Sequence, residues 1–126
     1  MDILDYYIKK EDERGWLWGI TQEPWIKEIN YIETNADEIR GNHYHTETKE
    51  MFFIIEGKVN VTVYNIHTAE REEYVFEKGD IFIVYPYEVH TFYSITYAKW
   101  INMLSKPVKN GKSDFNKYEL KLIKPI

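Results

Sequence analysis

Two histidines one residue apart, followed by a glutamate at the start of an apolar run, constrain this chain most. His43 and His45 are spaced so that, on a β-strand, both side chains point to the same face. After a short polar turn, Glu50 opens the apolar run 51–55, which indicates a returning strand. Imidazole and carboxylate groups are ligands that divalent transition metals prefer. The sequence therefore predicts two adjacent strands that carry most of a metal site.

Short segments typical of β-strands follow one another along most of the chain. Aromatic residues make up 17% of the sequence, which favours strands over helices. In 58–64, valines alternate with other residues, as in a half-buried strand, and no long window has a helical period. We therefore expect an all-β sandwich or barrel. The expected strands are 2–9, 25–34, 39–46, 51–55, 58–64, 73–77, 81–85, 88–94 and 98–104, and 16–20 is an aromatic-rich stretch between two turns.

Length and charge exclude several classes of function. The 126 residues fit one domain, 1–126, with N-terminal strands at 1–24, a barrel core at about 25–104 and a polar C-terminal tail at 105–126. Sixteen Lys and Arg against 21 Asp and Glu give a net charge of −5, so a nucleic-acid partner is not expected. The acidic N-terminus lacks a signal-peptide pattern, and no stretch has transmembrane length. We expect a cytoplasmic protein with no membrane partner.

The absence of cysteine limits the choice of metal ligands. With no thiolate available, any transition metal must be bound by His, Asp or Glu. A single histidine can equally be a packed or surface residue. His67 lies in a polar turn and is interpreted as a surface residue.

A second stretch extends the pattern around His90. Gly79-Asp80 forms a turn before an apolar run that Pro86 ends, and His90 follows. Together with the first stretch, this resembles the two motifs of the cupin superfamily. The resemblance implies a single-domain double-stranded β-helix, which is a jelly-roll barrel. Two details depart from the family: Glu88 stands where many cupins have Gly, and the segment from Pro86 to His90 is one residue shorter than usual.

The cupin resemblance also implies a ligand set. Carried over residue by residue, the metal ligands are His43, His45, Glu50 and His90. The cofactor is then a divalent transition metal, and zinc, manganese, iron and nickel all accept this set.

A closer resemblance spans roughly residues 11–104. Glu13-Arg14-Gly15, Tyr31 and Arg40-Gly41-x-His43-x-His45 are similar to the pattern of nucleotide-sugar cupins, which include 3,5-epimerases and 3,4-ketoisomerases of dTDP-4-keto-6-deoxy sugars. The two histidines followed by Glu50 are also similar to the metal-binding cupin domain of capsular polysaccharide reductases. These resemblances imply an isomerase or epimerase of a nucleotide-linked keto-sugar in surface polysaccharide biosynthesis.

The nucleotide-sugar resemblance implies roles for individual residues. Arg14 and Arg40 would bind the substrate, because guanidinium groups bind phosphate oxygens bidentately. Tyr31 would donate a proton, and His43 would be the catalytic base where no metal is bound. As a metal ligand, His43 cannot be a base through the same nitrogen, so these roles are rivals. Arg40 can equally solvate a strand end, and Tyr31 can simply pack.

Two other functions fit the same residues. One is a metal-dependent dioxygenase or an isomerase of small sugars or organic acids, and the other is a non-catalytic sugar-binding cupin. We also expect a homodimer, because small cupins commonly pair their barrels and the aromatic N-terminal stretch would otherwise leave a strand edge exposed.

Overall fold

The structure is a computed structural model that describes residues 1–109 and 113–120. The described residues form twelve strands and no helix, so none of them forms a helix long and apolar enough to cross a membrane. The strands are β1 (Asp2–Leu4), β2 (Ile8–Asp12), β3 (Gly15–Gly19), β4 (Glu28–Thr34), β5 (Ile39–His45), β6 (Glu50–Glu56), β7 (Lys58–Asn65), β8 (Arg71–Glu77), β9 (Ile81–Val84), β10 (Glu88–Ser94), β11 (Ala98–Leu104) and β12 (Phe115–Lys117).

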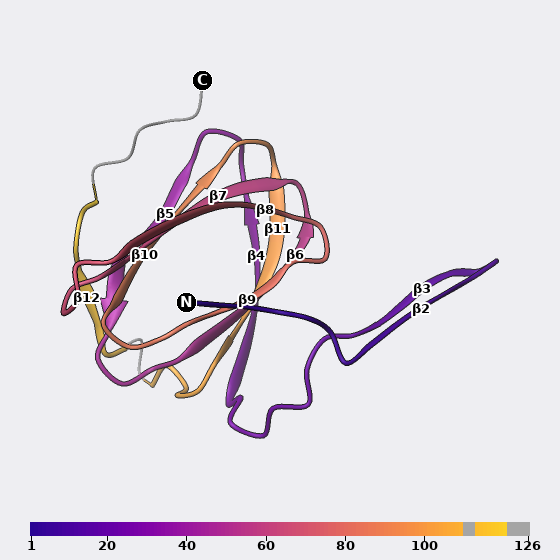
Figure 1. Cartoon of the computed structure of the whole chain (residues 1–126), viewed down its shortest axis with the longest axis horizontal. Coiled ribbons are helices and arrows are strands. Elements are labelled where there is room, and N and C mark those ends of the chain that lie inside the picture. The colour runs from indigo at the N-terminus through magenta and orange to yellow at the C-terminus, as the bar shows by residue number, and fades with distance from the viewer. Residues whose placement is uncertain (110–112, 121–126) are drawn as a thin grey trace.

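Ten of these strands form two five-stranded sheets that face each other (Figure 1). The first, here called the β6 sheet, has the order β1-β9-β6-β11-β4, and the second, the β5 sheet, has the order β12-β5-β10-β7-β8. All pairs are antiparallel, and consecutive strands repeatedly cross from one sheet to the other. This is the jelly-roll arrangement of a cupin, which confirms the predicted fold class.

Apolar side chains from both sheets fill the space between them. Val59, Val61 and Val63 alternate along β7 and are almost fully buried, as the alternation in the sequence predicts. They pack with aromatic residues of the β6 sheet, including Phe82 and Trp100. Three members of this cluster, Phe52, Phe92 and Trp100, also line the pocket described below.

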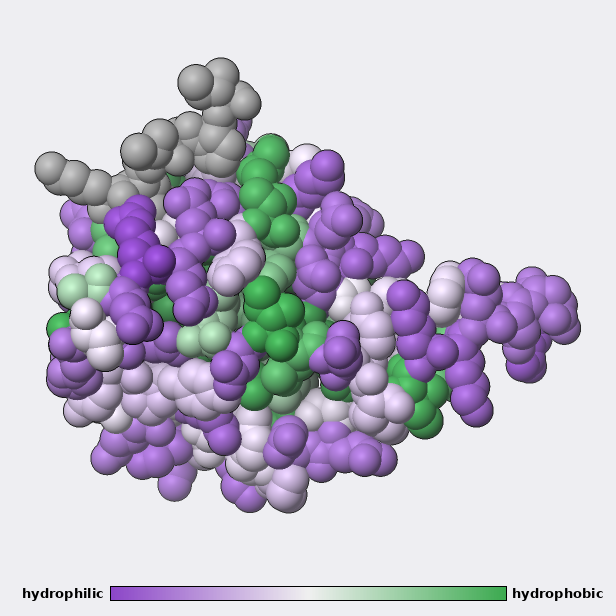
Figure 2. All heavy atoms as spheres, viewed as in Figure 1, coloured by the Kyte–Doolittle hydropathy of each residue, from purple (hydrophilic) through white to green (hydrophobic). Residues whose placement is uncertain are grey.

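The N-terminal residues cover the outer face of the β6 sheet. Leu4, Ile20 and Trp25 pack on an apolar cluster that contains Met51 and Met103. The β2–β3 hairpin, which lies between Leu4 and Ile20 in the sequence, projects away from the barrel (Figure 1). Its surface is mainly polar (Figure 2).

Most expected strands are found within one or two residues of their predicted ends. The segment 2–9 is the main exception, because it divides into β1 and the start of β2 around a bend. A strand within the polar C-terminal segment, β12, was not predicted, and it pairs with β5.

Candidate metal centre and substrate pocket

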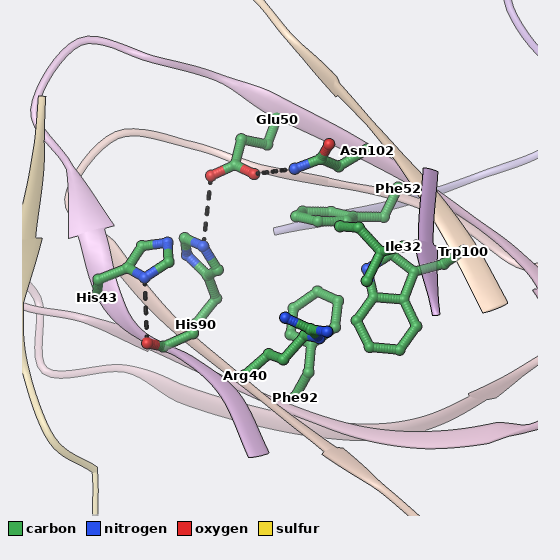
Figure 3. Close-up of a pocket in the computed structure, with 10 residues that line it drawn as sticks. Ile32, Arg40, His43, Glu50, Phe52, His90, Phe92, Trp100 and Asn102 are labelled. Atoms are coloured by element: carbon green, nitrogen blue, oxygen red, sulfur yellow. Dashed lines mark hydrogen bonds and ion pairs between the residues drawn. The ribbon is translucent and has the colours of Figure 1, made fainter. Parts of the chain in front are cut away.

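A pocket of about 220 Å³ opens between the two sheets (Figure 3). Each sheet contributes five of its ten lining residues. From the β6 sheet these are Ile32, Glu50, Phe52, Trp100 and Asn102, and from the β5 sheet they are Arg40, Gly41, His43, His90 and Phe92. The pocket therefore has a polar end around the histidines and an apolar wall of aromatic rings.

Four side chains with metal-binding atoms converge at the polar end. One ligand atom from each of His43, His45, Glu50 and His90 lies within 4.8 Å of the others. Glu50 Oε1 is 2.6 Å from Nε2 of His45 and 3.4 Å from Nε2 of His90. Apart from the half-buried His43, the residues of this four-residue cluster are buried. The residues predicted as ligands are thus brought together, and their role as ligands stays a prediction.

A β-bulge in β5 decides which side chains reach the pocket. His90 pairs with His43 across the β10–β5 ladder, but the next pairs are Thr91 with Gly41 and Phe92 with Arg40, so the register shifts by one residue. Gly41 has φ +96°, and a Cβ there would collide with the backbone oxygen of His90. The bulge changes the direction of the side chains along the strand, which places Arg40 and His43 on the same pocket although they are three positions apart.

The short turn before His90 is stabilised by local hydrogen bonds. Glu88 Oε1 accepts from the backbone N–H of Tyr85 at 2.8 Å, and the N–H of Tyr87 donates to the carbonyl of His45 at 2.7 Å. Tyr87 takes the left-handed conformation, with φ 66°, that such a tight turn requires. The two departures from the cupin pattern are therefore accommodated, and His90 still reaches the cluster.

Each of the three histidines in the cluster is oriented by a hydrogen bond at its Nδ1. Nδ1–H of His43 donates to the carbonyl of Gly41 at 3.1 Å, and that of His90 donates to the carbonyl of Glu88 at 3.1 Å. Nδ1 of His45 lies 2.9 Å from Oδ1 of Asp114. A proton on Nδ1 leaves the lone pair on Nε2, which is the tautomer that binds metal through Nε2.

The cluster shifts the pKa values of its members in opposite directions. Burial and then the charge of His90 lower the pKa of His43 to about 4, so this ring is neutral at pH 7. Burial would raise the pKa of Glu50, but the charges and hydrogen bonds of His90 and His45 hold it well below its usual range. Burial lowers the pKa of His45, yet its contacts with Glu50 and Asp114 outweigh this and raise it. At neutral pH the site therefore holds a carboxylate.

The donor set fits a divalent transition metal. Glu50 Oε1 is buried, and the closest polar atoms to it are Nε2 of His45 and Nε2 of His90, the two atoms that would bind a metal. An anionic oxygen in that position is costly unless a cation or donor satisfies it. Three imidazoles and one carboxylate also match the ligands that zinc, manganese, iron and nickel accept.

Beyond the four-residue cluster, the pocket is lined by the guanidinium group of Arg40 and by aromatic rings. Arg40 Nε donates to Thr34 Oγ1 at 2.8 Å and Nη2 donates to the carbonyl of Glu33 at 3.0 Å, which fixes the guanidinium between β5 and β4. No carboxylate within 1–109 or 113–120 forms an ion pair with it. Opposite the cluster, Trp100 and Phe92 pack with ring centroids 5.2 Å apart. The pocket therefore offers a cation and a flat apolar surface to a ligand.

Two residues predicted for the site lie elsewhere in the single chain. Arg14 is in the turn of the projecting hairpin, where its side chain is exposed and bonded to Asp12 at 2.6 Å. Tyr31 is on the outer face of β4, and its hydroxyl donates to Glu33 at 2.9 Å. Neither lines the pocket. The structure thus supports Arg40, but not Arg14 or Tyr31, as part of this pocket within one copy.

Two further residues at the site were not found from the sequence. Asn102 lines the pocket, and its Nδ2 donates to Glu50 Oε2 at 3.3 Å. Asp114 contacts His45 from a segment far along the chain. No motif marks either residue, because both contacts depend on how distant strands pair. In contrast, the sequence interpretation of His67 as a surface residue agrees with its exposure.

Several solved structures share this fold at low sequence identity. The capsular polysaccharide assembling protein CapF from Staphylococcus aureus matches with a TM-score of 0.70 and 18% identity, over 95% of this chain and 33% of that one. A 3,4-ketoisomerase from Helicobacter canadensis matches with a TM-score of 0.77 and 21% identity, over 92% of this chain and 89% of that one.

A third structure is the dTDP-6-deoxy-D-glucose-3,5-epimerase RmlC from Legionella pneumophila, in complex with dTDP-4-keto-L-rhamnose. It matches with a TM-score of 0.74 and 14% identity, over 92% of this chain and 76% of that one. The present chain thus spans about a third of the length of CapF but most of the length of the other two. These likenesses establish the RmlC-like cupin fold.

The family comparison covers most of the chain. No curated protein matches it significantly. Residues 10–105, however, match the family described as polysaccharide biosynthesis C-terminal domain. This range includes the whole four-residue cluster and every residue that lines the pocket. The chain is therefore a member of the polysaccharide biosynthesis C-terminal domain family, with an RmlC-like cupin fold.

Proposed function

We propose that this chain binds a divalent transition metal and isomerises or epimerises a nucleotide-linked keto-sugar in surface polysaccharide biosynthesis. The observation that carries the proposal is the convergence of His43, His45, Glu50 and His90 at one end of a pocket whose other end is apolar and contains Arg40. The family membership and the similarity to a 3,4-ketoisomerase and a 3,5-epimerase support the substrate class.

The pocket has the groups that such a substrate needs. Arg40 offers a fixed guanidinium to a phosphate or sugar oxygen, and two of the five N–H groups that a guanidinium carries are used to hold it. The rings of Phe92 and Trp100 provide an apolar surface for the face of a deoxy-sugar. Tyr31 is not part of this proposal, because its hydroxyl is bonded to Glu33 on the outer face of β4.

Isomerisation and epimerisation of a keto-sugar both begin with removal of a proton from the carbon next to the carbonyl. The proton goes to a base, and the resulting enolate must be stabilised until it is reprotonated. A bound metal would supply Lewis-acid polarisation of the carbonyl. His43, His45 and His90 present Nε2 to such a metal, while their Nδ1 atoms stay engaged with groups outside the cluster.

A metal-free mechanism is the alternative use of the same pocket. Nδ1 of His43 is held by the Gly41 carbonyl, and the low pKa of the ring keeps it neutral, so its Nε2 can accept a proton. His43 would then be the base. The same nitrogen cannot serve as ligand and base together, so metal content distinguishes the two mechanisms.

Elemental analysis of the purified chain, combined with a thermal-shift screen of nucleotide sugars, tests the proposal. We expect about one transition-metal ion per chain and an increase in melting temperature with a TDP-linked keto-sugar, because a ligand that binds only the folded state stabilises it. A protein without metal that is still stabilised by the sugar supports the His43 mechanism. A protein that retains metal but responds to no nucleotide sugar contradicts the proposed substrate class.

A further inference from the structure

Asp114 connects the histidine cluster to the C-terminal segment. Its Oδ1 lies 2.9 Å from Nδ1 of His45 and accepts from Thr48 Oγ1 at 2.6 Å. Its Oδ2 accepts from the backbone N–H groups of Glu47 and Thr48 at 2.6 and 2.8 Å. One carboxylate thus ties together the end of β5, the turn that leads to Glu50 and the start of β12.

This contact differs from those that orient the other two histidines. His43 and His90 each donate Nδ1–H to a backbone carbonyl two residues earlier on their own strands, Gly41 and Glu88. Such contacts form whenever the strand forms. His45 instead depends on a side chain 69 residues away in sequence. Its orientation is therefore sensitive to the C-terminal segment, whereas that of the others is set locally.

The geometry points to Asp114 as a positioning residue for His45. We propose that it fixes the proton of His45 on Nδ1 and aims the lone pair of Nε2 into the four-residue cluster, which raises the affinity of the cluster for a divalent metal. Nε2 of His45 is 2.6 Å from Glu50 Oε1, so it already points to the centre of the cluster. Carboxylates that hold the second nitrogen of a metal-binding histidine act in this way, and losing one typically reduces metal affinity about 10- to 100-fold. The affinity part of this inference rests on the proposed metal function.

The placement of β12 supports a role in the site for the C-terminal segment. β12 pairs with the histidine-bearing strand, with Phe115 opposite His45 and Lys117 opposite His43. The ring of Phe115 also lies 5.3 Å from the ring of His43. Asp114 and β12 both follow the range that matches the family, 10–105, so this contribution is a feature of the present chain beyond the matched domain.

Zinc affinity and the NMR signals of the histidine rings in Asp114 variants test the inference. The full chain, stripped of metal, is titrated with Zn²⁺ against a chromogenic chelator. We expect Asp114→Ala to bind Zn²⁺ about 10- to 100-fold more weakly than the unsubstituted chain, and Asp114→Asn to lie between them, since the amide oxygen still accepts from Nδ1–H but carries no charge. Asp80→Ala is the matched control, because Asp80 Oδ2 also accepts a backbone N–H in a turn, that of Glu77 at 2.7 Å. Its zinc affinity should be unchanged.

The second measurement is ¹⁵N NMR of the histidine rings in the metal-free protein. We expect a slowly exchanging, hydrogen-bonded Nδ1–H signal for His45 in the unsubstituted chain and a rapidly exchanging one in Asp114→Ala, with the Nδ1–H signal of His90 unchanged. Suppose that the unsubstituted chain binds zinc and that Asp114→Asn and Asp114→Ala both bind it as tightly as the unsubstituted chain does. The inference is then overturned, while the proposed metal function stands. If the unsubstituted chain binds no zinc, the metal function fails, and an unchanged His45 Nδ1–H signal in both variants then overturns the positioning role as well.

Discussion

Arg40 and His43 line the same pocket although they are three residues apart on one β-strand. On a regular strand their side chains would point to opposite faces. The bulge at Gly41, where the register between β5 and β10 shifts, brings both to the interior. A cationic group and the histidine cluster therefore face one ligand-sized space, and the predictions below test what that space does.

Arg40 should contribute to ligand affinity through its planar geometry. Replacing it with Lys keeps the charge but loses the contact of Nε with Thr34 and the bidentate fork. We expect Arg40→Lys to weaken binding of a TDP-linked sugar by about tenfold, in line with the loss of a charge-assisted hydrogen bond. Isothermal titration calorimetry measures this change. Arg14→Lys is the comparison, because Arg14 lies on the hairpin outside the pocket, and equal loss in both variants would contradict the assignment of Arg40 alone.

Metal retention should distinguish Glu50 from Glu47. Both acids follow the histidines, but Glu50 is buried in the cluster, whereas Glu47 is exposed and paired with Lys106 at 2.6 Å. Glu50→Gln removes an anionic ligand and should reduce the metal that remains after dialysis to background, while Glu47→Gln should leave it unchanged. Elemental analysis of the dialysed proteins checks this, and equal metal content would mean that Glu50 is not a ligand.

The stability of the metal-free protein should decrease as the pH falls from about 6.5 towards 4. The pKa of His43 is lowered to about 4 by burial and by His90, so over this range the unfolded chain takes up a proton that the folded chain does not. His45, whose pKa is raised, opposes this loss only near pH 6.5, whereas Glu50 and Asp114, whose pKa values are lowered, add to the loss below about pH 5. Urea unfolding in the presence of EDTA at several pH values measures the effect. His43→Gln should make the dependence between pH 6.5 and about 5 less steep, and an equally steep dependence over that range would contradict the assignment to His43.

The chain should be a homodimer at micromolar concentration. β4 is an edge strand whose outer face exposes Ile29 by 63%, and Figure 2 shows a band of apolar residues on the body of the molecule. On the projecting hairpin, Leu17 is 60% exposed. Exposed edges and apolar residues of this kind favour association with a second copy. We expect Ile29→Glu or Leu17→Glu to increase the monomer fraction in sedimentation experiments, and Val75→Glu, on β8 of the other sheet, to leave it unchanged. A monomeric unsubstituted chain would contradict this prediction.

The local features of the fold were predictable from the sequence. Alternating valines identified β7, and the spacing of His43 and His45 placed both rings on one face, because period two is a property of any regular strand. The cupin pattern also brought His90 to the same cluster. These predictions succeeded because each depends on neighbours in sequence or on a motif with fixed turns.

The features that depend on tertiary pairing were not predictable. Period-two reasoning alone does not bring Arg40 to the same pocket as His43, and only the bulge opposite Thr91 makes this possible. Asp114 lies in a polar segment that has no strand pattern, and its role arises because β12 pairs with β5. Tyr31 and Arg14 matched a family pattern in sequence, but the structure places one on an outer face and the other on the hairpin.

Solvent deuterium exchange tests the central claim most directly. The purified chain is incubated in D₂O with TDP-4-keto-6-deoxyglucose, and the sugar is followed by ¹H NMR. We predict loss of the proton signal on a carbon next to the ketone, because both isomerisation and epimerisation begin by removing that proton. Glu50→Gln and chelation should abolish the exchange if the metal is required, whereas chelation without effect assigns the base to a metal-free His43. No exchange with the untreated, metal-loaded chain would contradict the proposed activity.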